Sequence, residues 1–211
     1  MIKKGDFVEL EFTGRVKEGE VFDTTSKEEA EKACLQGKDI APLTICVGES
    51  MVPGGLDNAL EGKELSKEYK VELSPKDAFG ERKASLIKII PLNIFKEKGV
   101  MPYRGLLLNL DGILVKVLSV SGGRVITDFN NPLSGKQVVY TFKIKKIIAE
   151  DKEKIDCLGK FFLRDFKIKE LHKKEALIET TVPERFFSDF SARVKRLIGI
   201  EIKRAEISKT A

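Results

Sequence analysis

The sequence is short of the residues that most catalytic and metal sites need. His172 is the only histidine among 211 residues, and it lies in a charged run. The chain therefore has too few histidines for a histidine-based zinc site, and hardly enough for a Cys–His nucleophile pair. Three cysteines, Cys34, Cys46 and Cys157, lie far apart without C-x-x-C spacing, so we expect idle thiols. We expect no metal and no cofactor.

The short motifs of several enzyme classes are also missing. The chain has no G-x-S-x-G element, no P-loop and no G-x-G-x-x-G run. No stretch approaches the roughly 18–20 apolar residues that span a bilayer. Residues 1–6 include two lysines but no apolar segment follows them, which is not the pattern of a signal peptide. We therefore expect a cytoplasmic protein that does not contact a membrane.

Charge of one sign is not strongly in excess. The net charge is +5, and residues 151–211 hold 15 Lys and Arg against 11 Asp and Glu. An excess of this kind is compatible with nucleic acid or an acidic partner. Acidic residues are interleaved with the basic ones throughout, which favours a mixed solvated surface. A nucleic-acid-associated factor acting through residues 151–211 stays an alternative that we do not favour.

What the sequence does contain is a set of short strands around short helices. Val8, Leu10 and Phe12 alternate with glutamates, which is the period-two pattern of a half-buried strand. The same alternation recurs over 43–47, 69–73 and 138–144. Helices are expected over 26–38, with Ser26 as N-cap and Gly37 as the stop, and just before Gly62. This pattern predicts an α+β fold in which an antiparallel sheet wraps one short helix.

Residues 84–129 are richer in aliphatic residues than the rest of the chain. Leucine, isoleucine and valine crowd there, and Asp111-Gly112 and Ser121-Gly122 are hairpin turn signals. The apolar density exceeds what simple alternation needs. We interpret this stretch as a small β-rich domain inserted into the first, with an exposed client-binding surface. The alternative is that its aliphatic residues only fill a tight β core.

A third unit is expected from residue 151. Strands are predicted over 162–168, 176–181 and 201–207, and a helix runs from Pro183 to Ile198, where Gly199 ends it. The predicted domains are therefore 1–83 plus 130–150, the insert 84–129, and a C-terminal α+β domain, 151–211.

Five segments lie in a recognisable order: Val8–Gly14, Val21–Thr25, Pro42–Gly48, Gly55–Gly62 and Ser74–Gly80. In this order they resemble the FKBP-type peptidyl-prolyl cis-trans isomerases. The later Asn130–Gly135, running into Tyr140–Phe142, is similar to the SlyD-like branch, which carries an insert-in-flap domain where this chain has residues 84–129. The resemblance covers roughly residues 1–150, and the C-terminal part resembles that of the long archaeal members.

The resemblance implies a proline-binding pocket. Its residues would be Phe12, Phe22, Asp23, Leu43, Val52, Pro53, Leu56, Phe79 and Phe142. Phe79 stands where many members have a tyrosine whose hydroxyl binds ligand, and Pro53 has no backbone N–H to donate. Both departures weaken the expected binding of macrolides more than isomerisation. Taken singly, each of these apolar residues is equally well explained as ordinary core.

Such a pocket suits the reaction. Rotation about a peptide bond has a barrier of about 18–20 kcal/mol, and an apolar site favours the less charge-separated twisted state without any acid or base. We expect a prolyl isomerase that acts on unfolded or partly folded chains, with chaperone activity from the insert. The alternative is a client-binding module with weak or no activity. Six of the thirteen phenylalanines lie in residues 151–211, so we also expect a homodimer through that domain.

Overall fold

The computed structural model describes residues 1–35, 40–110, 112–163 and 165–205. The chain divides into two compact units. One contains Met1–Leu73 together with the chain from Val139 onward, and the other is Ser74–Val138. The three domain boundaries predicted above, with 151–211 as a separate domain, stay predictions.

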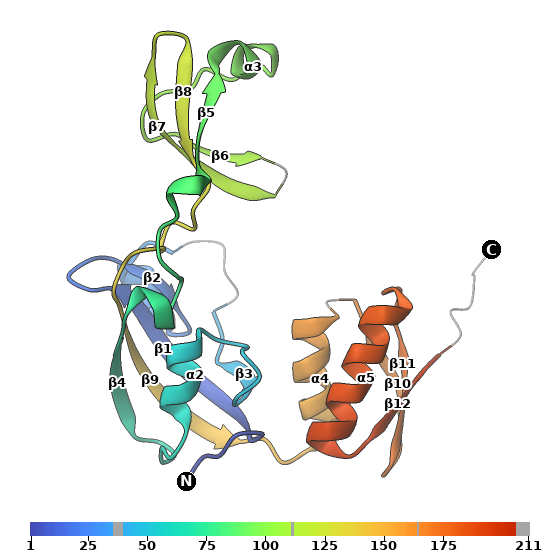
Figure 1. Ribbon diagram of the computed structural model, residues 1–211. Coiled ribbons are helices and arrows are strands. Elements are labelled where there is room, and N and C mark those ends of the chain that lie inside the picture. Colours follow the sequence, from blue (N-terminus) through green and yellow to red (C-terminus); the bar gives the residue numbers. More distant parts are fainter. Residues whose placement is uncertain (36–39, 111, 164, 206–211) are drawn as a thin grey trace. The chain divides into compact units, whose positions relative to one another are not determined.

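The first unit is built on a five-stranded sheet of order β2-β1-β9-β4, with β3 also paired to β1. Its strands are β1 (Phe7–Val16), β2 (Val21–Thr24), β3 (Leu43–Cys46), β4 (Glu68–Leu73) and β9 (Val138–Ile147). Both β2 and β3 run antiparallel to β1. Helix α2 (Gly54–Leu60) lies across this sheet and buries Leu56 and Leu60 completely. The expected α+β class is confirmed (Figure 1).

Helix α1 (Lys27–Lys32) begins where the sequence predicts. Ser26 is its N-cap, and the Ser26 hydroxyl accepts a hydrogen bond from the Glu29 N–H. The helix is shorter than the predicted 26–38, because it ends at the C-cap Ala33. The expected stop at Gly37 lies outside the described residues.

The second unit holds a four-stranded antiparallel sheet of order β5-β8-β7-β6. Its elements are the 3-10 turns η1 (Pro75–Asp77) and η2 (Ala84–Leu86), β5 (Ile87–Pro91), α3 (Leu92–Glu97), β6 (Leu107–Leu110), β7 (Ile113–Ser121) and β8 (Arg124–Asp128). The predicted hairpins join β6 to β7 and β7 to β8, although Asp111 itself lies outside the described residues. A small buried cluster forms from Phe95, Val117 and Val125.

The C-terminal part of the first unit places two helices beside a three-stranded sheet (Figure 1). Its elements are α4 (Asp151–Phe162), β10 (Lys167–Leu171), β11 (Glu175–Glu179), α5 (Glu184–Ile198) and β12 (Glu201–Arg204). β12 is parallel to β11, and α5 makes the connection between them. Helix α5 begins after Pro183 and ends at Gly199, whose φ is 81°, so this predicted helix is confirmed.

The predicted strand over 162–168 is wrong in its first half. Helix α4 continues to Phe162, and the strand begins at Lys167. Gly159 lies inside the helix because the Phe166 ring packs directly against it. A Cβ there would come within 2.4 Å of the ring.

Helix α4 also covers the edge of β3. The Cys157 thiol donates a hydrogen bond of 3.3 Å to the Thr44 carbonyl oxygen on that strand. A covered edge cannot pair with another chain. Burial raises the pKa of both Cys46 and Cys157 to about 12, so these two thiols stay protonated and inert, whereas Cys34 is exposed. Within the described parts of the chain, no helix is long and apolar enough to cross a membrane.

Candidate active site

Three aromatic rings meet on one face of the first unit's sheet. The Tyr140 ring on β9 lies edge-on to the Phe12 ring on β1 and to the Phe22 ring on β2, with ring centroids 5.8 Å apart in both pairs. Phe12 and Tyr140 are buried, and Phe22 is half-buried. Edge-to-face pairs of this kind contribute about 0.5–1.5 kcal/mol beyond the area that they bury. The three strands therefore assemble an aromatic wall.

Gly14 is what lets these rings come so close to the sheet. A Cβ at this position would lie 2.7 Å from the Tyr140 ring and 2.8 Å from the Phe22 ring. Gly14 lies opposite Asp23 in the β1–β2 register. Only a residue without a side chain fits beneath the two rings.

Asp23 brings a carboxylate to the aromatic wall. Burial raises the pKa of the Tyr140 phenol above its ordinary value, and the negative charge of Asp23 raises that pKa further. The phenol therefore stays neutral at physiological pH. The wall combines apolar rings, one neutral hydroxyl and one carboxylate.

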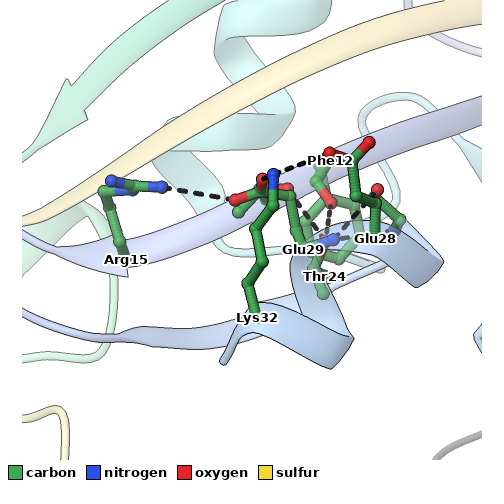
Figure 2. A network of polar contacts seen from close by, with 8 residues as sticks. Phe12, Arg15, Thr24, Glu28, Glu29 and Lys32 are labelled. Carbon is green, nitrogen blue, oxygen red and sulfur yellow. Dashed lines mark hydrogen bonds and ion pairs between the residues drawn. The ribbon is translucent and has the colours of Figure 1, made fainter. Parts of the chain in front are cut away.

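The position of Phe12 is fixed through its backbone. Its carbonyl oxygen accepts from the Thr25 N–H at 2.9 Å and from the Thr24 hydroxyl at 3.2 Å, while its N–H donates to the Thr25 hydroxyl at 2.8 Å. Figure 2 shows this anchor beside α1, where Lys32 pairs with Glu28 and Glu29 and Arg15 reaches Glu29. The sequence Thr24-Thr25 thus holds one ring of the wall and leads into the Ser26 cap.

A cavity of about 600 Å³ is lined by two of the predicted pocket rings, Phe12 and Phe142, together with Ile40 and Pro42. Charged side chains also line it, among them Glu11, Arg15, Glu29 and Lys143. The cavity therefore combines an apolar surface with charged side chains.

Val52, Pro53 and Leu56 come from the turn into α2. Pro53 is the helix N-cap, and its carbonyl oxygen accepts from the Leu56 N–H at 2.8 Å. Leu56 is fully buried, whereas Val52 and Pro53 are half-buried. Asp57 holds the preceding loop, because its carboxylate accepts from the N–H groups of Gly48 and Ser50.

Of the other predicted site residues, Leu43 and Phe142 belong to the first unit and Phe79 belongs to the second. Leu43 is 37% exposed and lines a cavity of about 420 Å³ with Phe161 of α4. Phe142 is buried and stacks on Tyr69, with centroids 5.7 Å apart. Phe79 belongs to the second unit, where its carbonyl oxygen accepts from the Ser134 hydroxyl. Phe12 and Phe22 both contact the Tyr140 ring, and the charge of Asp23 acts on the Tyr140 phenol.

Sequence reasoning missed Tyr140, the residue that contacts both predicted rings. Tyr140 and Phe142 are two residues apart on β9, so their side chains share one face. The signal was present in the alternation of Val138, Tyr140 and Phe142. The resemblance included Tyr140, but it assigned only Phe142 of this strand to the pocket.

The chemistry available at the wall is binding rather than proton transfer. Apolar rings offer a surface that excludes water from a bound ring, and a carboxylate can orient a polar group beside it. Among the described residues no three His, Cys, Asp or Glu side chains gather as a metal site would need. His172 pairs with Glu170 at 3.6 Å on an exposed turn.

Comparison with known proteins finds two family matches. Residues 1–94 match the family model of FKBP-type peptidyl-prolyl cis-trans isomerase, and residues 88–133 match that of the FKBP26 IF domain. The chain is 31% identical over 155 residues to a short-type peptidyl-prolyl cis-trans isomerase of Methanocaldococcus jannaschii, covering 72% of this chain and 98% of that protein. It is 26% identical over 157 residues to the FKBP-type peptidyl-prolyl cis-trans isomerase SlyD of Vibrio cholerae, covering 73% of this chain and 72% of that protein.

Proposed function

The chain belongs to the FKBP-type peptidyl-prolyl cis-trans isomerases, and we propose that it catalyses X-Pro rotation in folding proteins at the aromatic wall. The resemblance inferred from the order of motifs is confirmed. The observation that carries the proposed site is the packing of Phe12 and Phe22 around Tyr140 with Asp23 beside them. We further propose the cytoplasm as its location.

The aromatic wall accelerates rotation because it stabilises the twisted X-Pro bond more than the planar one. Planarity comes from resonance that separates charge between oxygen and nitrogen, and that separation is better solvated by water than by aromatic rings. Each tenfold acceleration needs about 1.4 kcal/mol of this preference. The neutral phenol of Tyr140 adds no charge that would oppose it. Asp23 orients the bound chain.

A proline-limited refolding assay tests the activity. We expect faster cis-trans exchange of X-Pro bonds than the spontaneous rate, with an apolar residue preferred before proline. Asp23→Ala should lower the rate while the circular dichroism spectrum is unchanged. A wild-type chain without acceleration would favour the alternative, a client-binding module that has lost catalysis.

We propose that the insert holds unfolded chains for the isomerase. Its buried core is small, so large apolar side chains are left in contact with water. Those more than 40% exposed are Ile89, Ile94, Met101, Tyr103, Leu107, Ile113 and Leu114. Exposed large apolar side chains in this number weigh against the alternative of a tight core, and they support a binding surface.

Replacing residues 84–129 with a short loop separates the two activities. Catalysis on a proline tetrapeptide should stay near the wild-type rate, because the first unit supplies the aromatic wall. Catalysis on an unfolded protein and suppression of its aggregation should both fall sharply, since the local supply of bound chain is lost. Equal losses on both substrates would mean that the insert supports the pocket instead.

A further inference from the structure

Two arginines of α5 hold the loop that joins β3 to α2. Glu49 lies in the turn between β3 and α2, and its carboxylate contacts Arg196 at 2.8 and 3.0 Å and Arg193 at 3.2 Å. The Glu49 side chain is only 9% exposed. A carboxylate so well covered needs its positive partners, because without them it would have to regain water.

Arg193 is itself held in place. The Arg193 guanidinium stacks on the Phe162 ring at 3.8 Å from its centroid, which joins α5 to the end of α4. Planar guanidinium groups are suited to this combination of stacking and carboxylate binding. Arg193 therefore reaches the loop from a preorganised position.

The other side of the loop is tied to α2. The buried Asp57 carboxylate accepts from the N–H groups of Gly48 and Ser50, on either side of Glu49. Gly48 and Ser50 both have positive φ, 88° and 57°. A left-handed serine is an unfavourable conformation that its surroundings must maintain. Val52 and Pro53 follow after Met51.

We propose that Arg193 and Arg196 are positioning residues of the isomerase, because they set the loop that carries Val52 and Pro53, two residues that the resemblance assigns to the proline pocket. Asp57 fixes the loop from inside and the arginine pair fixes it from outside. The C-terminal helices thereby act on the proline pocket without touching the client. This inference rests on the proposed function for its effect on catalysis, and on the loop geometry for its effect on structure.

Full-length Glu49→Gln and the double variant Arg193→Ala/Arg196→Ala test the proposal. Both should lower kcat/KM on a proline tetrapeptide about three- to tenfold, and both should speed hydrogen exchange at the amides of Gly48 and Ser50. Arg196→Lys keeps the charge and should retain most of the activity. Lys17→Ala is the control, because it removes an exposed ion pair with Glu72. It should change neither kcat/KM nor hydrogen exchange at Gly48 and Ser50.

Two results would overturn the proposal. One is a lower melting temperature with unchanged kcat/KM, which would mean that the arginines only dock the helices. The other is unchanged exchange at Gly48 and Ser50 in both variants. Exchange is measured without reference to activity, so it still decides the loop's role if the wild-type chain proves inactive and the proposed function fails.

Discussion

The Tyr140 ring stands edge-on to the Phe22 ring, with centroids 5.8 Å apart and an angle of 87° between the ring planes. Tyr140 comes from the last strand of the isomerase sheet and Phe22 from the second, so the contact joins segments more than a hundred residues apart. Gly14 lies beneath both rings. The aromatic wall therefore depends on an aromatic ring at Tyr140 and on the lack of a side chain at Gly14.

Tyr140→Ala should lower kcat/KM on a proline tetrapeptide about tenfold or more, because Phe12 and Phe22 both lose the ring that supports them. The same change should cost about 3–5 kcal/mol of unfolding free energy. Tyr140→Phe is the matched control, since it keeps the ring, and it should stay within about threefold of wild type. If Tyr140→Ala and Tyr140→Phe lower kcat/KM equally, the hydroxyl and not the ring is the part of Tyr140 that catalysis needs.

The pH dependence of catalysis should be flat. Burial and the charge of Asp23 hold the pKa of Tyr140 above its ordinary value of about 10, so the phenol remains neutral from about pH 6 to pH 9. His172 is exposed and forms part of the charged turn. We expect kcat/KM on a tetrapeptide to vary less than about twofold over this range. A bell-shaped profile would instead indicate a titrating group at the pocket.

Gly14→Ala should be far more harmful than alanine at another glycine of the same fold. Its Cβ would overlap the rings of Tyr140 and Phe22, an overpacking that costs about 1–3 kcal/mol. Gly54→Ala at the start of α2 is the matched control, because no atom lies within 4 Å of its added Cβ. Urea unfolding of the two variants checks the difference, and similar midpoints would contradict the close packing.

The strands and helix α5 could be predicted because their signals are local. Val8, Leu10 and Phe12 alternate, and Pro183 and Gly199 mark the ends of a helix. Helix α4 was missed for a reason that is not local. Its glycine, Gly159, looks like a helix breaker, and only the packed Phe166 ring explains it.

The candidate site could be predicted only in part. The resemblance supplied Phe12, Phe22 and Asp23, which the fold places around one ring. Tyr140 needed the register of β9, because two aromatic residues on one strand face are equivalent until their neighbours are known. The contacts of Glu49 with Arg193 and Arg196 join residues nearly 150 positions apart. No sequence pattern predicts them.

Asp128 should make the stability of the second unit depend on pH. Its side chain accepts from Arg82 at 2.6 Å and from Asn130 at 2.7 Å, where the two chain segments at the base of the four-stranded sheet meet. Burial alone would raise the Asp128 pKa, but these hydrogen bonds from Asn130 and Arg82 outweigh it and lower the pKa. The stabilisation is therefore present above the ordinary aspartate value of about 3.9 and is lost as the pH falls through the lowered folded-state pKa.

Asp128→Asn should lower the unfolding free energy at pH 7 by about 1–3 kcal/mol. The difference from wild type should shrink as the pH falls below about 4. Urea unfolding followed at several pH values measures both effects. Asp77→Asn alters an exposed carboxylate of the same unit, so its effect should be small at every pH. A constant difference between Asp128→Asn and wild type would contradict the assigned charge.

The six phenylalanines of residues 151–211 divide into two groups. Phe187 and Phe190 are buried, Phe162 lies under the Arg193 guanidinium, and Phe166 packs on Gly159. Phe161 and Phe186 are 45% and 57% exposed. The internal core thus accounts for four rings. Phe161 packs edge-on to Phe162, with centroids 4.9 Å apart, but Phe161 and Phe186, one on each helix, stay largely exposed.

We predict that these two rings form the contact of a homodimer that presents two isomerase sites to one client. Aromatic side chains are enriched in such interfaces, where they supply much of the binding energy. Light scattering of the full chain at tens of micromolar should give the mass of a dimer, and Phe161→Glu/Phe186→Glu should give a monomer with an unchanged circular dichroism spectrum. Met101→Glu alters a 75% exposed side chain of the other unit and should leave the dimer intact. A monomeric wild-type chain would remove the dimer, and the phenylalanines would then need an internal core or a different partner.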